Sequence, residues 1–184
     1  QTMTHTTLKG EELRDQLHAL ATRDGIRQWD LGASRGMNAS VQVDRGEAKQ
    51  MKAAQRRSIT VRVWNEQGLV GVTSTSDLSP GGLDKALKGA YQASSFGNAE
   101  DIPGFSPLAT AAIPELDRPL KPSQSIQTLL STLKDVEGEL LAKHPAIETV
   151  PYNGLSEGNS ERIYLNSEGA LRHMQRTQAS LYLY

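Results

Sequence analysis

Apolar and polar residues alternate over 59–63 and again over 69–75. The residues between these segments, Asn-Glu-Gln-Gly at 65–68, are typical of a tight turn. Ser79 follows as a candidate helix cap, with a proline directly after it. The pattern therefore predicts a β-hairpin that leads into a helix over 79–95.

Two further segments carry apolar residues at the spacing of an amphipathic helix, and they lie at 10–24 and 123–143. Gly25 is placed to end the first of these helices, and Pro145 to end the second. The chain is thus expected to contain three helices of similar length.

The remaining apolar alternation predicts several strands, although the middle ones are rich in polar residues and glycine. Five prolines between 97 and 122 predict an extended connection at the surface. The order of helices and strands shows no regular alternation, so we expect an α+β fold with three helices packed on a mostly antiparallel sheet. We expect a flexible start over 1–9 and one domain over 10–184. The further strands are predicted at 29–33, 37–43, 47–55, 147–152, 161–165 and 170–184.

Two short sequences accompany this order of elements: Ser-Thr-Ser-Asp-Leu-Ser-Pro at 74–80 and Asn-Ser-Glu-Gly at 166–169. Together with the order of elements, they make the chain resemble the amino-terminal part of the TldD/PmbA family, proposed peptidases once called modulators of DNA gyrase. The sequence at 74–80 is more similar to the PmbA (TldE) branch than to the TldD branch. The resemblance covers most of the chain from Gly10 onward, and the order of elements carries it more than either short sequence.

The last residues, 179–184, alternate up to Tyr184 between aliphatic residues and residues that carry a hydroxyl group, which are Ser180 and two tyrosines. Members of the resembled family are more than twice as long as this chain. We therefore expect an amino-terminal fragment from which the carboxy-terminal domain is absent.

The composition is that of an ordinary soluble protein, with 20 Lys and Arg residues against 21 Asp and Glu residues. This balance gives no general attraction to nucleic acid or to a membrane surface. No apolar run reaches the roughly 20 residues that span a bilayer, and residues 1–8 do not form a secretory signal, so a cytoplasmic location is expected. The chain has no cysteine, which excludes disulfides and thiolate ligands.

Basic residues gather on candidate strands without the aromatic residues that a protein binding single-stranded nucleic acid would use. These basic residues are Arg45, Lys49, Lys52, Arg56, Arg57, Arg172, His173 and Arg176.

The resemblance implies a zinc peptidase, which needs two histidines on one helical face and a glutamate beside one of them. None of the four histidines, His5, His18, His144 and His173, is followed by glutamate. We therefore assign no catalytic, cofactor or metal residue to this chain. The resemblance places an HExxxH motif in the TldD branch, beyond this part of the protein, so zinc is expected in a catalytic partner or in the absent half.

Two polar groups are candidates for contact with a substrate cleft or a partner subunit. Each has a structural alternative, since the first can cap a helix and the second can form a hairpin turn. The candidates are Ser76 and Asp77 in the first group, and Asn166, Ser167, Glu168 and Gly169 in the second.

Two functions remain open. In the first, the chain is the structural and cleft-forming domain of a PmbA-like subunit, and it joins a TldD-like subunit or a second copy to cleave peptides or unfolded proteins. In the second, it is a non-enzymatic protein–protein interaction module. Assays of peptide cleavage with and without a TldD-like partner and a chelator would separate them.

Overall fold

The computed structural model describes residues 8–98 and 104–184, which form two compact units. Most of the expected flexible start, residues 1–7, lies outside the described residues. One of the five prolines of the expected connection, Pro103, also lies outside them, within 99–103. Of the described residues, the first unit comprises 8–35, 57–98, 104–117 and Glu161–Met174, and the second comprises Gly36–Arg56, Arg118–Ser160 and Gln175–Tyr184.

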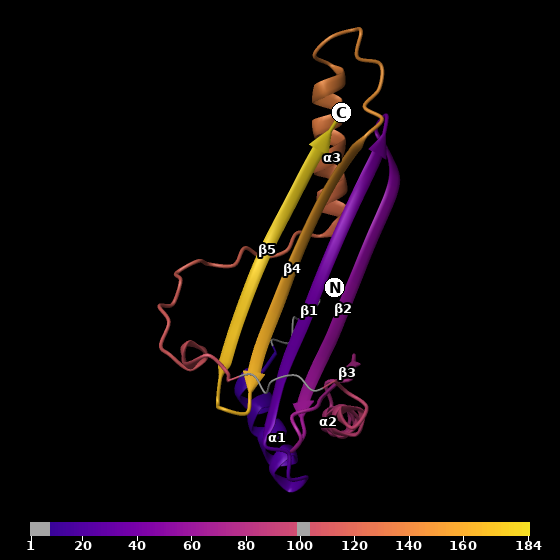
Figure 1. Ribbon diagram of the computed structural model, residues 1–184. Coiled ribbons are helices and arrows are strands. Elements are labelled where there is room, and N and C mark those ends of the chain that lie inside the picture. The colour runs from indigo at the N-terminus through magenta and orange to yellow at the C-terminus, as the bar shows by residue number, and fades with distance from the viewer. Residues whose placement is uncertain (1–7, 99–103) are drawn as a thin grey trace. The chain divides into compact units, whose positions relative to one another are not determined.

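Five strands form one antiparallel sheet in the order β3-β2-β1-β4-β5 (Figure 1). The α+β prediction is thereby confirmed. The strands are β1 (Gln28–Asp44), β2 (Glu47–Trp64), β3 (Val70–Thr75), β4 (Asn153–Asn166) and β5 (Leu171–Leu183).

The predicted breaks within the first two long strands are wrong. The segments 29–33 and 37–43 belong to the single strand β1, and 47–55 continues without interruption into the hairpin strand as β2. Residues 47–58 are all exposed, so no buried side chains mark the strand in the sequence. Backbone pairing, which leaves no periodic apolar signal, continues the strand through this region.

The strand predicted at 147–152 is also wrong, because β4 begins only at Asn153. Pro151 has no amide hydrogen to donate to a ladder. The buried Asn153 side chain orders this segment instead, since its Nδ2 donates to the carbonyls of Val43 at 2.7 Å and Val150 at 2.9 Å, and its Oδ1 accepts from the Val43 amide at 2.8 Å.

The predicted hairpin in the first unit is confirmed. Strands β2 and β3 pair antiparallel, with Ile59 opposite Thr75 and Trp64 opposite Val70. Asn65 Oδ1 accepts hydrogen bonds from the amides of residues 67 and 69, at 2.9 and 3.0 Å. The turn thus depends on a side chain that the sequence placed at its start.

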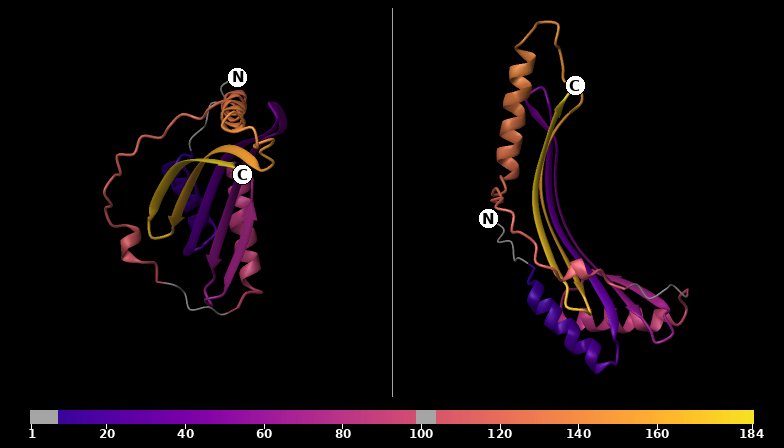
Figure 2. Two further views of the ribbon diagram at one scale, coloured as in Figure 1. Left: turned by 90° about the horizontal axis from the view of Figure 1, so that it is seen from above. Right: turned by 60° about the vertical axis from the view of Figure 1, so that its left-hand side comes forward.

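Helices α1 (Gly10–Arg23) and α2 (Pro80–Ser94) cover one face of the sheet in this unit (Figure 2). Ser79 caps α2 as predicted, and its Oγ accepts from the Gly82 amide at 3.1 Å. The two helices and the sheet share one buried core, which includes Leu13, Leu17, Trp29, Leu31, Ile59, Val61, Val63, Leu83, Leu87, Ile163 and Leu165.

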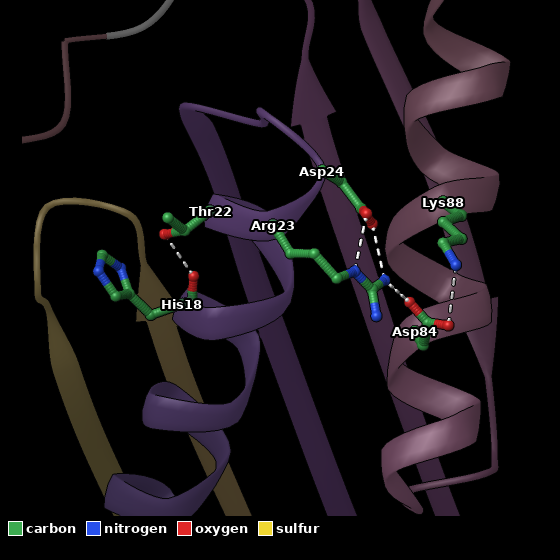
Figure 3. Close-up of polar contacts among 6 residues, drawn as sticks. All are labelled: His18, Thr22, Arg23, Asp24, Asp84 and Lys88. Atoms are coloured by element: carbon green, nitrogen blue, oxygen red, sulfur yellow. Dashed lines mark hydrogen bonds and ion pairs between the residues drawn. The ribbon is translucent and has the colours of Figure 1, made fainter.

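Arg23, the last residue of α1, forms ion pairs with Asp24, which follows it, and with Asp84 on α2 (Figure 3). Lys88 Nζ lies 3.1 Å from the Asp84 carboxylate, one turn earlier on α2. Hydrogen bonds from the guanidinium of Arg23 lower the pKa of Asp24 and Asp84. All four side chains reach solvent, so these ion pairs contribute little to the free energy of folding.

The second unit contains α3 (Ile126–Leu141), whose cap is Ser125 rather than residue 123. Its Leu129 and Leu133 pack with Val41 and Val43 of β1. Within the described part of the connection, the short 3₁₀ helix η1 (Pro107–Ala109) replaces a fully extended chain, because Ser106 Oγ accepts from the Leu108 amide.

Glu137 of α3 is only 1% exposed and binds the turn between β1 and β2. Its carboxylate accepts hydrogen bonds from the amides of Arg45 at 3.1 Å and Gly46 at 2.8 Å. Both turn residues have positive φ, 48° and 81°, as the favoured two-residue hairpin turn requires. One buried carboxylate therefore joins the helix to the hairpin.

We expect Glu137→Ala to lower the free energy of unfolding by about 2 kcal/mol, since it leaves two turn amides without their acceptor. Urea unfolding followed by circular dichroism measures the change. Glu139→Ala is the matched control, because Glu139 is exposed on the same helix. Equal midpoints for the two variants would contradict the anchoring role of Glu137.

Candidate functional site

The first predicted group, Ser76 and Asp77, lies in the connection from β3 to α2. Asp77 Oδ1 accepts from the Ser79 amide at 2.9 Å, and the Asp77 amide donates to Thr75 Oγ1 at 3.1 Å. A Cβ on Gly82 would lie 2.4 Å from the Asp77 carbonyl oxygen, so the backbone approaches α2 closely here. Asp77 thus orders the helix entrance, while Ser76 is exposed.

Hydrogen bonds from Ser79 hold the pKa of Asp77 below its ordinary value. The stability that Asp77 contributes is therefore complete above that ordinary value, about 3.9, and is lost as the pH falls through the lower value of the folded protein. We expect the urea midpoint of the parent protein to fall more on acidification from about pH 6 to about pH 2.5 than that of Asp77→Asn. Asp117→Asn is the control, and an equal fall in parent and Asp77→Asn would contradict this assignment.

The second predicted group, residues 166–169, forms the turn between β4 and β5. Asn166 Oδ1 accepts from the amides of Glu168 at 3.0 Å and Ala170 at 3.1 Å, and Gly169 takes φ +89°. Ser167 exchanges two hydrogen bonds with the backbone of Trp29, at 2.9 and 3.2 Å. These residues build a turn, and Glu168 alone among the four has an exposed side chain.

Each predicted group is thus ordered within its own local structure. Within residues 8–98 and 104–184, no hydrogen bond or ion pair joins Ser76 or Asp77 to the 166–169 turn. Their role in contacting a cleft or a partner stays a prediction.

A polar network that the sequence analysis did not single out crosses three neighbouring strands of the first unit. The Asp30 side chain is 3% exposed, and Arg62 binds it through both a 2.8 Å Nε bond and a second guanidinium bond. Tyr164 donates its hydroxyl to Asp30 at 3.2 Å. Because the neighbours of Asp30 in sequence belong to the core, this network lies on the face opposite α1 and α2.

Burial, together with the Asp30 carboxylate, raises the pKa of Tyr164, although the Asn166 side chain acts in the opposite direction. Tyr164 is therefore a neutral hydrogen-bond donor to the carboxylate at physiological pH.

Aromatic contacts extend this open face, by which we mean the sheet face that carries Asp30, Arg62 and Tyr164. The Arg62 guanidinium lies 5.0 Å from the Trp64 ring centroid, and Phe105 meets Trp64 edge-on at 5.9 Å. On β5, Arg172 donates to two carbonyls of the 104–111 segment, at 2.6 and 2.8 Å. Contacts from β2 and β5 thus hold this segment beside the open face.

A second buried carboxylate, Glu161, organises the helix-covered side of the same unit and is 6% exposed. It accepts from the Leu8 amide at 2.9 Å, contacts His173 Nε2 at 2.7 Å and pairs with Arg35 at 3.6 Å. Arg35 lines a cavity of about 320 Å³ together with Leu8, Lys9, Glu12, Leu13, Gln16, Arg57, Leu78 and Pro80.

Two of the histidine side chains have local structural partners among the described residues. His173 contacts Glu161, and His144 Nδ1 accepts from the Ala146 amide at 3.0 Å. His18 lies on α1, and His5 is outside the described residues. Among the described residues no three His, Asp or Glu side chains converge as a metal site would require. We therefore derive no chemical step through zinc on this chain.

None of the described helices is long and apolar enough to cross a membrane. The comparison with curated proteins gives no significant match.

Several solved structures share the fold. A proposed modulator of DNA gyrase from Thermotoga maritima matches with a TM-score of 0.70 at 17% identity, over 95% of this chain and 39% of that one. TldE from Thermococcus kodakarensis matches with a TM-score of 0.70 at 15% identity, over 94% and 38%. A proposed modulator of DNA gyrase from Bacteroides thetaiotaomicron gives 0.68 at 16%, over 93% and 39%. The chain spans about two fifths of the length of these proteins.

Two family models match consecutive parts of the sequence. Residues 29–94 match domain 1 of the PmbA/TldA metallopeptidases, and residues 119–184 match their central domain. The models carry the names of both branches and do not separate them. Together they cover the β1–β2 hairpin, α2, α3 and the β4–β5 hairpin, so the chain belongs to the TldD/PmbA family.

Proposed function

We propose that this chain supplies one wall of the substrate cleft in a PmbA-like subunit of a TldD/PmbA metallopeptidase. A TldD-like subunit carries the zinc and the catalytic residues, and the assembly cleaves peptides or unfolded proteins in the cytoplasm. Both matching models describe metallopeptidase domains, and one similar structure is a TldE protein, which supports this assignment.

The open face is the observation that carries the proposal. Its Asp30, Arg62 and Tyr164 are held in place by mutual hydrogen bonds, and the Arg62 guanidinium lies against the buried Trp64 ring. The Arg62 side chain remains 47% exposed, so part of the guanidinium faces solvent. An ordered face with a partly exposed guanidinium suits an extended peptide, whose backbone carbonyls can accept hydrogen bonds from it.

A specific observation favours the alternative function, a protein–protein interaction module. The described part of the connection exposes several large apolar side chains, which is typical of surfaces that bind other proteins. These residues are Leu108, Ile113, Leu116 and Leu120.

The test uses the full-length protein, with and without a TldD-like partner, and a fluorescently labelled unfolded protein as substrate. We expect chelator-sensitive cleavage only when both subunits are present. Tyr164→Phe should raise KM several-fold with little change in kcat, because it loosens the Asp30 and Arg62 network without touching catalytic groups.

Tyr91→Phe is the matched control, since Tyr91 lies on α2 and bonds to Glu66 at the surface. Unchanged KM in Tyr164→Phe would overturn the cleft assignment. Stable binding of the partner without any cleavage would instead establish the interaction module.

A further inference from the structure

The cavity of about 320 Å³ lies on the helix-covered side of the first unit, away from the open face. Its walls come from the residues that open α1, from the start of α2 and from strands β1 and β2. This volume is at the lower end of the range for small-molecule sites, about 300 to 1,000 Å³. The cavity is therefore large enough for one small ligand.

Two arginines stand side by side in this cavity. The Ser34 and Ser58 hydroxyls lie 2.8 Å apart on neighbouring antiparallel strands. Arg35 follows Ser34 and Arg57 precedes Ser58, so these two arginines are neighbours on the other face of the sheet, the one that the helices cover. Like charges in this position repel each other and destabilise a sheet. An anion bound between the two arginines would offset this repulsion.

Only one of these arginines has an anionic partner. Arg35 pairs with Glu161 at 3.6 Å, whereas the Arg57 side chain has no ion pair or hydrogen bond within the described residues. Asp77 feels the charge of Arg57, but its carboxylate is engaged by the Ser79 amide. The Arg57 guanidinium is thus available to an incoming ligand.

The other charges around the cavity do not cancel this excess. Lys9 and Glu12 pair with each other at 3.8 Å and are both well exposed at the rim. The first turn of α1 has no side-chain cap, so its free amides add positive potential at the same wall, which the carboxylates of Glu11 and Glu12 in that turn partly offset. The cavity therefore favours an anion.

Apolar side chains complete the walls: Leu8, Leu13, Leu78 and Pro80. We propose that this cavity is a binding site for a small ligand that carries one carboxylate and a branched aliphatic group. The carboxylate pairs with Arg57, and the aliphatic group packs on the leucines. Such a ligand is either the carboxyl end of a peptide or a free aliphatic acid.

The 184-residue chain, labelled with ¹⁵N, is titrated with N-acetyl-L-leucine, N-acetyl-L-leucinamide and 4-methylpentanoate. N-acetyl-L-leucine should shift the amides of Leu13, Arg57 and Leu78 saturably, and the uncharged leucinamide should bind at least tenfold more weakly. Equal affinity for 4-methylpentanoate identifies a free aliphatic acid as sufficient, whereas weaker binding identifies the peptide end.

Arg57→Gln should weaken the binding of N-acetyl-L-leucine at least tenfold, and Arg57→Lys should retain part of it. Arg56→Gln is the control, because residue 56 points to the opposite face and does not line the cavity. The same spectra report whether each variant is folded. Equal affinity for the acid and the amide, no shift with any probe, or no effect of Arg57→Gln would overturn the proposal.

Discussion

Replacing Gly71 by alanine should lower the free energy of unfolding by about 3 kcal/mol or more, because it forces β3 and α2 apart. A Cβ at this position would lie 1.8 Å from the Ala90 carbonyl oxygen and 2.4 Å from the Ser94 amide nitrogen. Both atoms belong to the helix backbone, which cannot yield as a flexible side chain can. The helix must shift and open the core of the first unit.

Chemical unfolding monitored by tryptophan fluorescence measures this loss, since Trp29 and Trp64 are buried in the same unit. Gly32→Ala, in β1 of the same sheet, is the matched control, because its Cβ would meet nothing within 4 Å. If the two variants unfold at the same denaturant concentration, then the contact between α2 and β3 is looser than the structure shows.

The elements that could be predicted from the sequence are those whose local signals agree. The hairpin has alternating apolar residues on both strands and Asn65 at its turn, and α2 has Ser79 as its cap. In both cases the information lies within a few residues of the element it specifies.

The errors arise where local signals are weak or misleading. Residues 47–58 of β2 have no buried face, so their sequence has no apolar alternation that would predict a continuous strand. The segment 147–152 has apolar residues suited to a strand, yet Pro151 and the side-chain bonds of Asn153 hold it outside the sheet. Hydrogen bonds to backbone groups, from the neighbouring strand in the first case and from a side chain in the second, decide both cases, and apolar periodicity does not report them.

The candidate sites were harder to predict because their partners are distant in sequence. Asp30 meets Arg62 and Tyr164, and Glu161 meets Arg35, only after the strand order is known. The sequence offered one signal for Asp30, which is its position between two apolar residues of a strand, Trp29 and Leu31. Such a residue faces away from the helices, but the sequence does not say what it binds.

The two family models and the two compact units divide the chain differently. The domain 1 model runs without interruption over 29–94, whereas the first unit leaves out 36–56 and takes in 161–174. The long strands cause this difference, since each crosses from one unit to the other partway along its length. The open face and the cavity both belong to the first unit. The open face combines residues matched by both models, whereas the cavity is lined by residues of the domain 1 match and by residues 8–16, which precede it.

The second large effect is expected at Arg62. Arg62→Ala should lower the free energy of unfolding by about 3 kcal/mol, because it leaves the buried Asp30 carboxylate with the Tyr164 hydroxyl in place of a guanidinium. Arg62→Lys should recover only part of the loss, since lysine cannot form two parallel bonds to the carboxylate or stack on Trp64 in the same way.

A double-mutant cycle separates this explanation from a simple loss of packing. Asp30→Ala removes the buried charge itself, so the variant with both Arg62→Ala and Asp30→Ala should be more stable than Arg62→Ala alone. If Arg62 acted mainly by covering Trp64, the two losses would add, and the double variant would be the least stable of the three. Unfolding midpoints of the parent and the three variants therefore decide whether the open face is held together by the charge of Asp30 or by the stem of Arg62.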